Sequence, residues 1–307
     1  MHQLTFSIKP LPPFRLDFTA WVLRRRSTNI VDRLQNGVYG RVLMLDDVPV
    51  EVAVCQRGSV ETPLLMVSVT AGRSVSPTDI RRAIEDMLGT RVDMNDFYAK
   101  AEEENGKLGE LVRRFRGVKP PRFPSIFEAL VNAVAGQQVS LGAGVQFLNR
   151  LSQTYGRRIE LSGSLHYAFP RPSDLSNLPV DELRPLGFST RKSRTLIELS
   201  RKVATGALEL DSIGHMSEDR ALVYLDEIPG IGRWSSEYVL LRGLGRTNIF
   251  PGDDVGARNG LTRLLNIKSD LDYDGVKQAL VEWKGYGGLL YFHLRLNQLE
   301  NSGYISR

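Results

Sequence analysis

Two adjacent carboxylates, Asp253 and Asp254, directly follow Pro251-Gly252 and precede a segment that is expected to form a helix. The simplest role for an aspartate at this place is the helix N-cap, whose side chain accepts a backbone N–H. Only one of the two can be the cap. A carboxylate at a helix N-terminus tends to stay ionised, so the other aspartate is a candidate for a fixed negative charge in a reaction.

A glycine-rich turn lies upstream of these carboxylates, in the stretch IPGIGRWSSEYVLLRG, residues 228–243. It places Gly230 and Gly232 directly before a helix that is expected to begin near Arg233. Glycine allows backbone angles that are closed to other residues, and it leaves the amide groups bare. Bare amides at a helix N-terminus form an anion site, so the turn predicts contact with a phosphate. A purely structural corner between two helices is the alternative.

The elements that position these residues follow from the pattern along the 307 residues, a length that suits two domains. The first third predicts a sheet with helices. Two β-rich runs surround Asp46-Asp47 in a hairpin pattern, and TPLLMVSVTAG, residues 62–72, adds a strand. Ser76 and Pro77 begin a helix that stops at Gly89. The basic, proline-rich segment after Phe115 marks a domain boundary near residue 117.

Beyond this boundary the pattern predicts helices. Ser125 and Glu128 form a capping box for the first of them. Ser140 begins the second helix, after a break at Gly136-Gln137-Gln138. Further helices are predicted over LPVDELRPLG, STRKSRTLIELSRKV, SEDRALVYLDE and the C-terminal segment that contains YGGLLYFHLRL.

The net charge of the chain is +5 and its pI is about 9.3. This charge favours a polyanionic partner, but it equally fits a merely basic protein. The basic residues cluster in three segments: Arg24, Arg25 and Arg26; Arg113, Arg114, Arg116, Lys119 and Arg122; and Arg191, Lys192 and Arg194. The third cluster falls in the first turn of a predicted helix, where the helix dipole disfavours cations. It is interpreted either as surface charge or as a set of phosphate contacts.

Several classes of site are excluded by composition. The single cysteine, Cys55, excludes an internal disulfide, a cysteine-built zinc site and a four-cysteine iron–sulfur cluster. The four histidines are scattered and suggest no metal triad: His2, His166, His215 and His293. No window approaches the ~20 apolar residues of a membrane span, and the N-terminus lacks a signal-peptide pattern. We therefore expect an intracellular protein without membrane contact.

The segments LDEIPGIGRWSSEYVLLRGLG, residues 225–245, and FPGDDVGARNGLTRLL, residues 250–265, closely resemble the helix–hairpin–helix DNA glycosylases. These enzymes carry a Gly/Pro-rich loop and a catalytic aspartate. More narrowly, the segments are similar to the bacterial 3-methyladenine DNA glycosylase II type, known as AlkA. The resemblance extends upstream to FEALVNAVAGQQVS, residues 127–140, and to LGFSTRKSRTLIELS, residues 186–200.

The resemblance implies an α+β fold of two parts. Residues 1–117 look loosely like the antiparallel, TATA-binding-protein-like domain of that group and are expected to support the rest. Residues 118–307 are expected to form an all-helical helix–hairpin–helix glycosylase region that holds the active site.

The resemblance assigns the catalytic role to the second carboxylate, Asp254, which leaves Asp253 as the helix cap. Trp234 and Tyr238 are four residues apart and share one helix face. A core contact is the simplest interpretation of such a pair, but the resemblance implies a pocket for a base flipped out of the duplex. Tyr286 stands where AlkA-type enzymes also have an aromatic residue. Three electron-rich rings favour a cationic base by cation–π attraction of ~1–2 kcal/mol.

The resemblance also implies how the duplex is held. Gly230 and Gly232, with Arg233 and Ser235, are assigned to contact with a DNA phosphate, which positions DNA without reading its sequence. A structural Na⁺ or K⁺ is implied to bridge the hairpin to that phosphate. Its ligands are the backbone carbonyls of Asp226, Ile228 and Ile231.

The second glutamine of GQQVS, Gln138, is assigned to the wedge that fills the gap left by the flipped base. The better-known bacterial member has an apolar residue there. Glutamine fills space and hydrogen-bonds the orphaned partner base, but it stacks less well. A turn glutamine exposed to water is the alternative.

The sequence therefore predicts a monofunctional DNA glycosylase that hydrolyses the N-glycosidic bond of alkylated bases such as 3-methyladenine in duplex DNA. Relatives that cut the strand have a nucleophilic lysine at the position of Trp234, so we expect water as the nucleophile. A cationic base leaves as a neutral species and needs no general acid, so one carboxylate suffices. No cofactor is required, and we expect a monomer. Two alternatives stay open: a glycosylase of the same superfamily for oxidised or deaminated bases, and a non-catalytic hairpin protein that only grips DNA.

Overall fold

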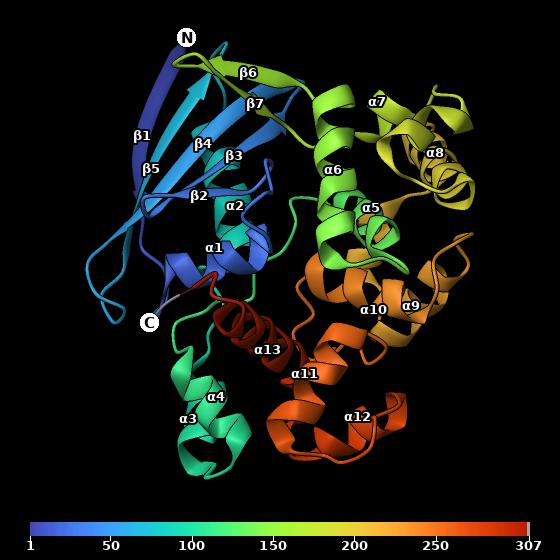
Figure 1. The fold of residues 1–307 in the computed structure, drawn as a ribbon. Coiled ribbons are helices and arrows are strands. Elements are labelled where there is room, and N and C mark those ends of the chain that lie inside the picture. The colour runs from blue at the N-terminus through green and yellow to red at the C-terminus, as the bar shows by residue number, and fades with distance from the viewer. Residues whose placement is uncertain (306–307) are drawn as a thin grey trace.

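The computed structural model describes residues 1–305. An N-terminal five-stranded antiparallel sheet is followed by a largely helical region, so the predicted α+β class is confirmed (Figure 1). The strand order is β1-β5-β4-β3-β2. The strands are β1 (His2–Ile8), β2 (Arg33–Gln35), β3 (Val38–Leu45), β4 (Val48–Arg57) and β5 (Leu64–Ala71).

The predicted hairpin joins β3 to β4. Its two turn residues, Asp46 and Asp47, have φ of 44° and 63°, and a two-residue turn with positive φ at both positions matches the twist of paired strands. Leu45 pairs with Val48 across the turn. Alternate residues of β5 are buried, which is the pattern of a sheet with one covered face.

The covered face of the sheet packs against α1 (Leu16–Arg24) and α2 (Pro77–Leu88). The predicted ends of α2 are confirmed. The Ser76 side chain accepts the N–H of Asp79, and Gly89 has a φ of 60°, the left-handed conformation that glycine adopts without strain.

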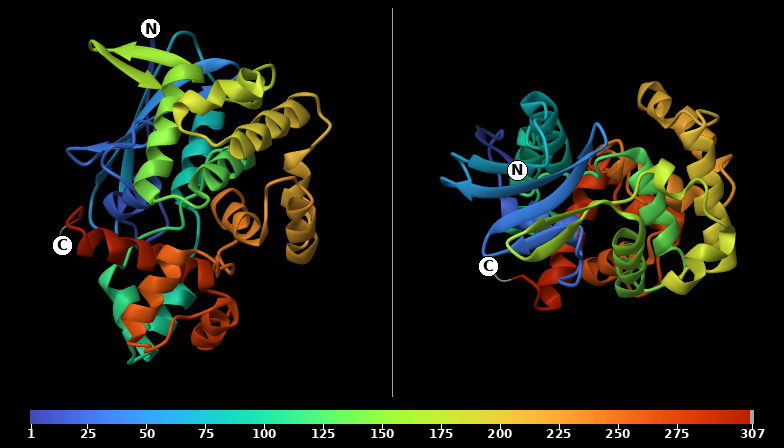
Figure 2. Two further views of the ribbon diagram at one scale, coloured as in Figure 1. Left: turned by 45° about the vertical axis from the view of Figure 1, so that its right-hand side comes forward. Right: turned by 90° about the horizontal axis from the view of Figure 1, so that it is seen from above.

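The helical region begins with α5 and lies beside the sheet, as the view from above in Figure 2 shows. Its helices are α5 (Ile126–Gly136), α6 (Leu141–Tyr155), α7 (Pro172–Leu175), η1 (Val180–Leu186), α8 (Thr190–Ala204), η2 (Leu210–His215), α9 (Glu218–Asp226), α10 (Arg233–Arg242), α11 (Val255–Leu265), α12 (Tyr273–Ala279), η3 (Val281–Trp283) and α13 (Gly287–Asn301). None of the helices within residues 1–305 is long and apolar enough to cross a membrane.

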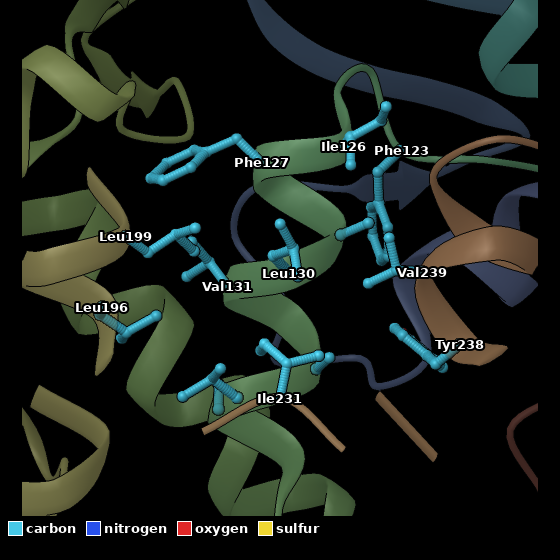
Figure 3. Packing of buried hydrophobic residues seen from close by; sticks show 14 of the residues in the cluster. Phe123, Ile126, Phe127, Leu130, Val131, Leu196, Leu199, Ile231, Tyr238 and Val239 are labelled. Atoms are coloured by element: carbon cyan, nitrogen blue, oxygen red, sulfur yellow. The ribbon is translucent and has the colours of Figure 1, made fainter. Parts of the chain in front are cut away.

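Helix α5 is the centre of the main helical core. All of its residues from Ile126 to Ala135 are buried. Figure 3 shows Leu130 and Val131 of α5 between Leu196 of α8 and Val239 of α10. Because α8 and α10 both pack on α5, this helix fixes the place of the hairpin that precedes α10.

Two features differ from the sequence prediction. The region after residue 117 is not all helical, because β6 (Arg158–Leu161) and β7 (Ser164–Tyr167) form a two-stranded sheet there. In addition, α3 (Asn95–Glu103) and α4 (Lys107–Arg114) share a core with α11 and α13 rather than with the five-stranded sheet. The domain boundary near residue 117 stays a prediction.

The sheet and the helical core are joined by a buried ion-pair network. Arg41 of β3, with a side chain 1% exposed, donates to Asp32 at 2.7 Å and to Glu128 of α5 at 2.5 Å. The Tyr39 hydroxyl also donates to Asp32. The predicted capping box is therefore half right. Ser125 accepts the N–H of Glu128, but the Glu128 side chain turns to Arg41, the buried cation it neutralises.

Replacing Arg41 by methionine should lower the free energy of unfolding by about 3–5 kcal/mol, because two buried carboxylates lose their cation. Urea denaturation followed by circular dichroism measures this. The control is Arg82→Ala, which breaks a pair with Asp79 whose side chains are 75% and 45% exposed and should cost less than about 1 kcal/mol. Equal, small losses for both variants would contradict the role of the network.

Candidate active site and DNA interface

The turn between α9 and α10 depends on glycine at one of its two positions. Gly230 has a φ of +88°, and a Cβ there would lie 2.3 Å from Oγ1 of Thr195 on α8. Both the left-handed backbone and the contact with α8 exclude a side chain. The turn is closed by the N–H of Ile231, which donates to the Ile228 carbonyl at 3.0 Å.

Gly232 differs from the expectation that both glycines need special backbone angles. Its φ is −134°, an ordinary extended value, and a Cβ there would meet nothing within 4 Å. It is the N-cap of α10, and the first helical bond runs from the N–H of Ser236 to its carbonyl. Within residues 1–305, the N–H groups of Arg233, Trp234 and Ser235 have no hydrogen-bond partner. The hairpin therefore has unpaired backbone N–H groups next to Gly232, which carries no side chain.

The side chains predicted to bind DNA around these amides have partners within the protein. Arg233 donates to Asp253 at 2.7 Å, and its guanidinium lies 3.8 Å from the ring centroid of Tyr273. Ser235 is 2% exposed, and its hydroxyl accepts the side-chain amide of Gln137. Of these two side chains only Arg233 is exposed.

Trp234 and Tyr238 lie in contact on one face of α10. Their ring centroids are 5.5 Å apart and the planes are tilted by 31°, so no third ring fits between them. Tyr238 is buried beside Val239 (Figure 3). Trp234 is half-buried and packs close to Gly136 at the end of α5; its Nε1 is buried without a partner.

Tyr286 belongs to a different aromatic group. Its ring lies 5.5 Å from that of Phe97 on α3, in the core of α3, α4 and α13. Among the residues that the structure describes, no ring contact joins Tyr286 to Trp234 or Tyr238. A pocket shared by these three rings stays a prediction.

Asp254, not Asp253, is the N-cap of α11, which corrects the sequence prediction. The helix begins at the very next residue, so the Asp254 Oδ1 is in position to accept the N–H of Ala257 at 2.8 Å. Its other oxygen, Oδ2, accepts the hydroxyl of Tyr291 at 2.9 Å. Asp253 instead pairs with Arg233. Asp254 thus caps α11, and its hydrogen bond with Tyr291 also fixes its orientation relative to α13.

Two residues around this carboxylate were not predicted from the sequence, Tyr291 and Arg295 of α13. Burial, followed by the Asp254 charge, raises the pKa of Tyr291 well above its usual value, so its hydroxyl keeps its proton. Burial disfavours the charge of Arg295, but the negative charge of Asp254 opposes this, and the pKa of its guanidinium is raised. Their spacing of four residues in YFHLR was the available signal, since it puts both on one helix face.

The turn between α5 and α6 lies against the hairpin. Gln138 has a φ of 54° and is exposed. Its neighbour Gln137 donates to the Gly230 carbonyl at 2.9 Å, and Lys192 of α8 donates to the Gln137 carbonyl at 2.6 Å. Gln138 therefore projects from a turn that is anchored on both sides. Lys192, a candidate for phosphate contact, is used in this anchor.

The family is identified by its characteristic sequence pattern. The pattern of the HhH-GPD superfamily base excision DNA repair proteins matches residues 131–285, half of the chain. The chain belongs to the HhH-GPD superfamily. It is a DNA glycosylase of this family, and the predicted helix–hairpin–helix assignment is confirmed.

Two bacterial proteins resemble the chain over most of its length. The DNA-3-methyladenine glycosylase of Bacillus subtilis is 25% identical over 92% of this chain and 93% of its own. DNA-3-methyladenine glycosylase 2 of Escherichia coli is 26% identical over 79% of this chain and 82% of its own.

Two solved structures show the same fold. The 3-methyladenine DNA-glycosylase from Archaeoglobus fulgidus has a TM-score of 0.84 at 24% identity and covers 97% of this chain and 99% of its own. An 8-oxoguanine glycosylase/lyase of Clostridium acetobutylicum, in complex with double-stranded DNA, has a TM-score of 0.76 at 15% identity and covers 97% and 98%. The fold alone therefore does not indicate which damaged base is released.

The basic clusters in the HhH-GPD chain are mostly used inside the protein. In the first, Arg24 donates to the Leu34 carbonyl and Arg25 to Asn132. The members of the second all contact protein groups: Arg113 with Glu104, Arg114 with Asn297, Arg116 with Glu61, Lys119 with Val92 and Arg122 with Asp86. Of the third cluster, Arg191 and Arg194 are exposed. Most of the basic side chains that cluster in the sequence therefore make contacts within the protein.

The proposed cation ligands are carbonyls of the HhH-GPD hairpin, Asp226, Ile228 and Ile231. The Ile228 carbonyl accepts the Ile231 N–H, which leaves one of its lone pairs for an ion. Within residues 1–305, no cluster of three histidine, cysteine or acidic side chains could hold a metal. A carbonyl-bound Na⁺ or K⁺ at this turn stays a prediction.

The two hairpin glycines should respond differently to alanine. Gly230→Ala should lower the free energy of unfolding by at least about 1–2 kcal/mol, the cost of a left-handed non-glycine residue, with the Thr195 clash in addition. Gly232→Ala should cost less, because its angles are ordinary and its surroundings open, so only the weaker N-cap preference of alanine acts. Thermal melting of both variants measures this. Equal losses would show that Gly232 also has a structural role.

Proposed function

We propose that the protein is a monofunctional glycosylase that releases alkylated bases, 3-methyladenine among them, from duplex DNA. The observation that carries this proposal is the Asp254 carboxylate, held between the Ala257 N–H and the Tyr291 hydroxyl. Its two oxygens are thereby fixed by groups of two different helices, α11 and α13.

The chemistry follows from the placement of charge. When the N-glycosidic bond breaks, its electron pair leaves with the base and positive charge develops on the sugar. A fixed carboxylate next to the sugar stabilises that charge, as in glycoside hydrolysis. Water then adds to the sugar carbon and its proton passes to solvent. A base that is already cationic departs neutral, so no second carboxyl acid is needed.

The aromatic pair supports a preference for charged bases. Alkylation of a purine ring nitrogen creates a formal positive charge, and the half-buried Trp234, in contact with Tyr238, has an electron-rich ring. Such attraction is worth about 0.5–2 kcal/mol, depending on desolvation. A neutral oxidised guanine would gain little from it. This distinguishes the proposal from a glycosylase for oxidised bases that shares the fold.

The absence of strand cleavage is proposed from Trp234 and Lys192. Trp234 occupies the position at which strand-cutting relatives have a nucleophilic lysine. Lys192 of α8 is committed to the carbonyls of Ala135 and Gln137, although burial lowers its pKa. Both points support water as the nucleophile.

The grip on DNA is proposed to use the free amides at the start of α10. A phosphate bound there would be reached by backbone N–H groups, since Gly232 has no side chain. The exposed Gln138 is proposed as the wedge in the gap left by the flipped base. A hairpin protein that only bound DNA would need neither Asp254 nor the aromatic face, which argues against the non-catalytic alternative.

The test is base release by Asp254→Asn on DNA that contains 3-methyladenine. Asparagine still caps a helix, so the fold and lesion binding should persist. The lost charge should reduce the single-turnover rate by at least about 10²–10³-fold. Release is followed by chromatography of the free base.

The matched variant is Asp253→Asn, which removes the ion pair with Arg233 but leaves the Asp254 carboxylate. It should keep most of the activity. If Asp253→Asn is inactive and Asp254→Asn active, the assignment is reversed. If both stay active, the aspartate pair is structural and the proposed function is wrong.

A further inference from the structure

A buried carboxylate that the proposed mechanism does not use lies one turn into the hairpin helix. Glu237 of α10 is 4% exposed. Its Oε2 accepts the backbone N–H of Gly252 at 3.1 Å, and its Oε1 accepts the hydroxyl of Tyr273 on α12. Gly252 precedes Asp254 by two residues. Glu237 therefore ties the catalytic loop, defined as residues 251–254, directly to α10.

Tyr273 holds the same loop through its ring. A Cβ at Gly252 would lie 2.6 Å from Cδ2 of Tyr273, so the ring packs against bare backbone. The guanidinium of Arg233 stacks 3.8 Å from the ring centroid and donates to Asp253 of the loop. The Arg233–Asp253 pair is partly exposed, with side chains 54% and 30% exposed, and contributes little. The catalytic loop is thus anchored to α10 mainly by Glu237, with the Tyr273 ring packed against Gly252.

Burying a carboxylate has a cost that an apolar residue would avoid. Burial raises the pKa of Glu237, and the nearby charge of Asp253 raises it further. Hydrogen bonds from Tyr273 and Gly252, together with the Arg233 charge, oppose this rise. Glu237 is costly to bury, and each of its two oxygens accepts a hydrogen bond. Its presence therefore indicates that these two hydrogen bonds, rather than packing, are needed here.

We propose that Glu237 and Tyr273 are positioning residues that fix the catalytic loop, and with it Asp254, relative to the aromatic face of α10. The inference rests on the proposed function of Asp254. Trp234 and Tyr238 lie on one face of α10, and Glu237 lies on the neighbouring face. A single helix therefore sets both the wall for the base and the place of the carboxylate that acts on its sugar.

The test compares Glu237→Gln and Tyr273→Phe with the unmodified protein. Glutamine has one acceptor oxygen where glutamate has two, and phenylalanine keeps the ring on Gly252 but loses the hydroxyl. Single-turnover release of 3-methyladenine should fall about 10–100-fold, as for a catalytic group displaced by about 1 Å. The Kd for duplex DNA with an uncleavable abasic-site analogue should not change. The double variant should be no slower than the slower single variant, because both remove the same anchor.

Lys277→Gln is the control. Its Nζ lies 4.5 Å from the Tyr273 ring centroid, and within residues 1–305 it makes no hydrogen bond to the catalytic loop. It should release base at the unmodified rate. Unmodified rates in both Glu237→Gln and Tyr273→Phe would overturn the proposal. Parallel losses of rate and affinity would also overturn it, since they would indicate general damage to the interface.

Asp254→Asn in the same assay separates this inference from the proposed function. If Asp254→Asn is inactive while Glu237→Gln is fully active, only the positioning role is wrong. If Asp254→Asn is itself fully active, the proposed function fails, and the positioning role fails with it.

Discussion

The residues of α10 from Ser235 to Arg242 are all buried, so this helix cannot rotate or slide without opening the core around it. Val239 packs toward α5 (Figure 3), and Leu241 contacts α13, where a Cβ at Gly288 would lie 2.5 Å from it. The exposed start of α10 carries the hairpin amides, and its flanks carry Trp234 and Glu237. The backbone amides proposed to bind DNA, the aromatic Trp234 and the loop-binding Glu237 are therefore all held by one rigid helix.

Around that helix the Asp254 carboxylate is held in place by groups of two other helices. The N-terminus of α11 supplies an N–H, Tyr291 supplies a hydroxyl, and Arg295 supplies positive charge nearby. Preorganised groups of this kind lower a barrier because they need not reorient during the reaction. The five-stranded sheet contributes at a distance, because Arg41 ties it to Glu128 on α5, the helix against which α10 packs.

Local signals in the sequence predicted local structure well. Ser76 and Gly89 end a helix as expected, Ser140 caps α6, and the hairpin sits between α9 and α10. The features that were not predicted depend on tertiary structure. Which aspartate caps α11 depends on where the helix begins, and the partner of Glu128 is 87 residues away in the sequence. The grouping of Tyr286 with Phe97 likewise reflects packing between segments that no local pattern encodes.

The central claim is that a fixed carboxylate and water release cationic bases and leave the DNA strand intact. The most direct measurement incubates the unmodified protein with duplexes that each contain 3-methyladenine, hypoxanthine or 8-oxoguanine. Borohydride is present, and free base, strand length and covalent adducts are analysed together. The account predicts fastest release of 3-methyladenine, an uncut abasic strand and no trapped adduct. A protein–DNA adduct, or release of 8-oxoguanine as fast as 3-methyladenine, would contradict it.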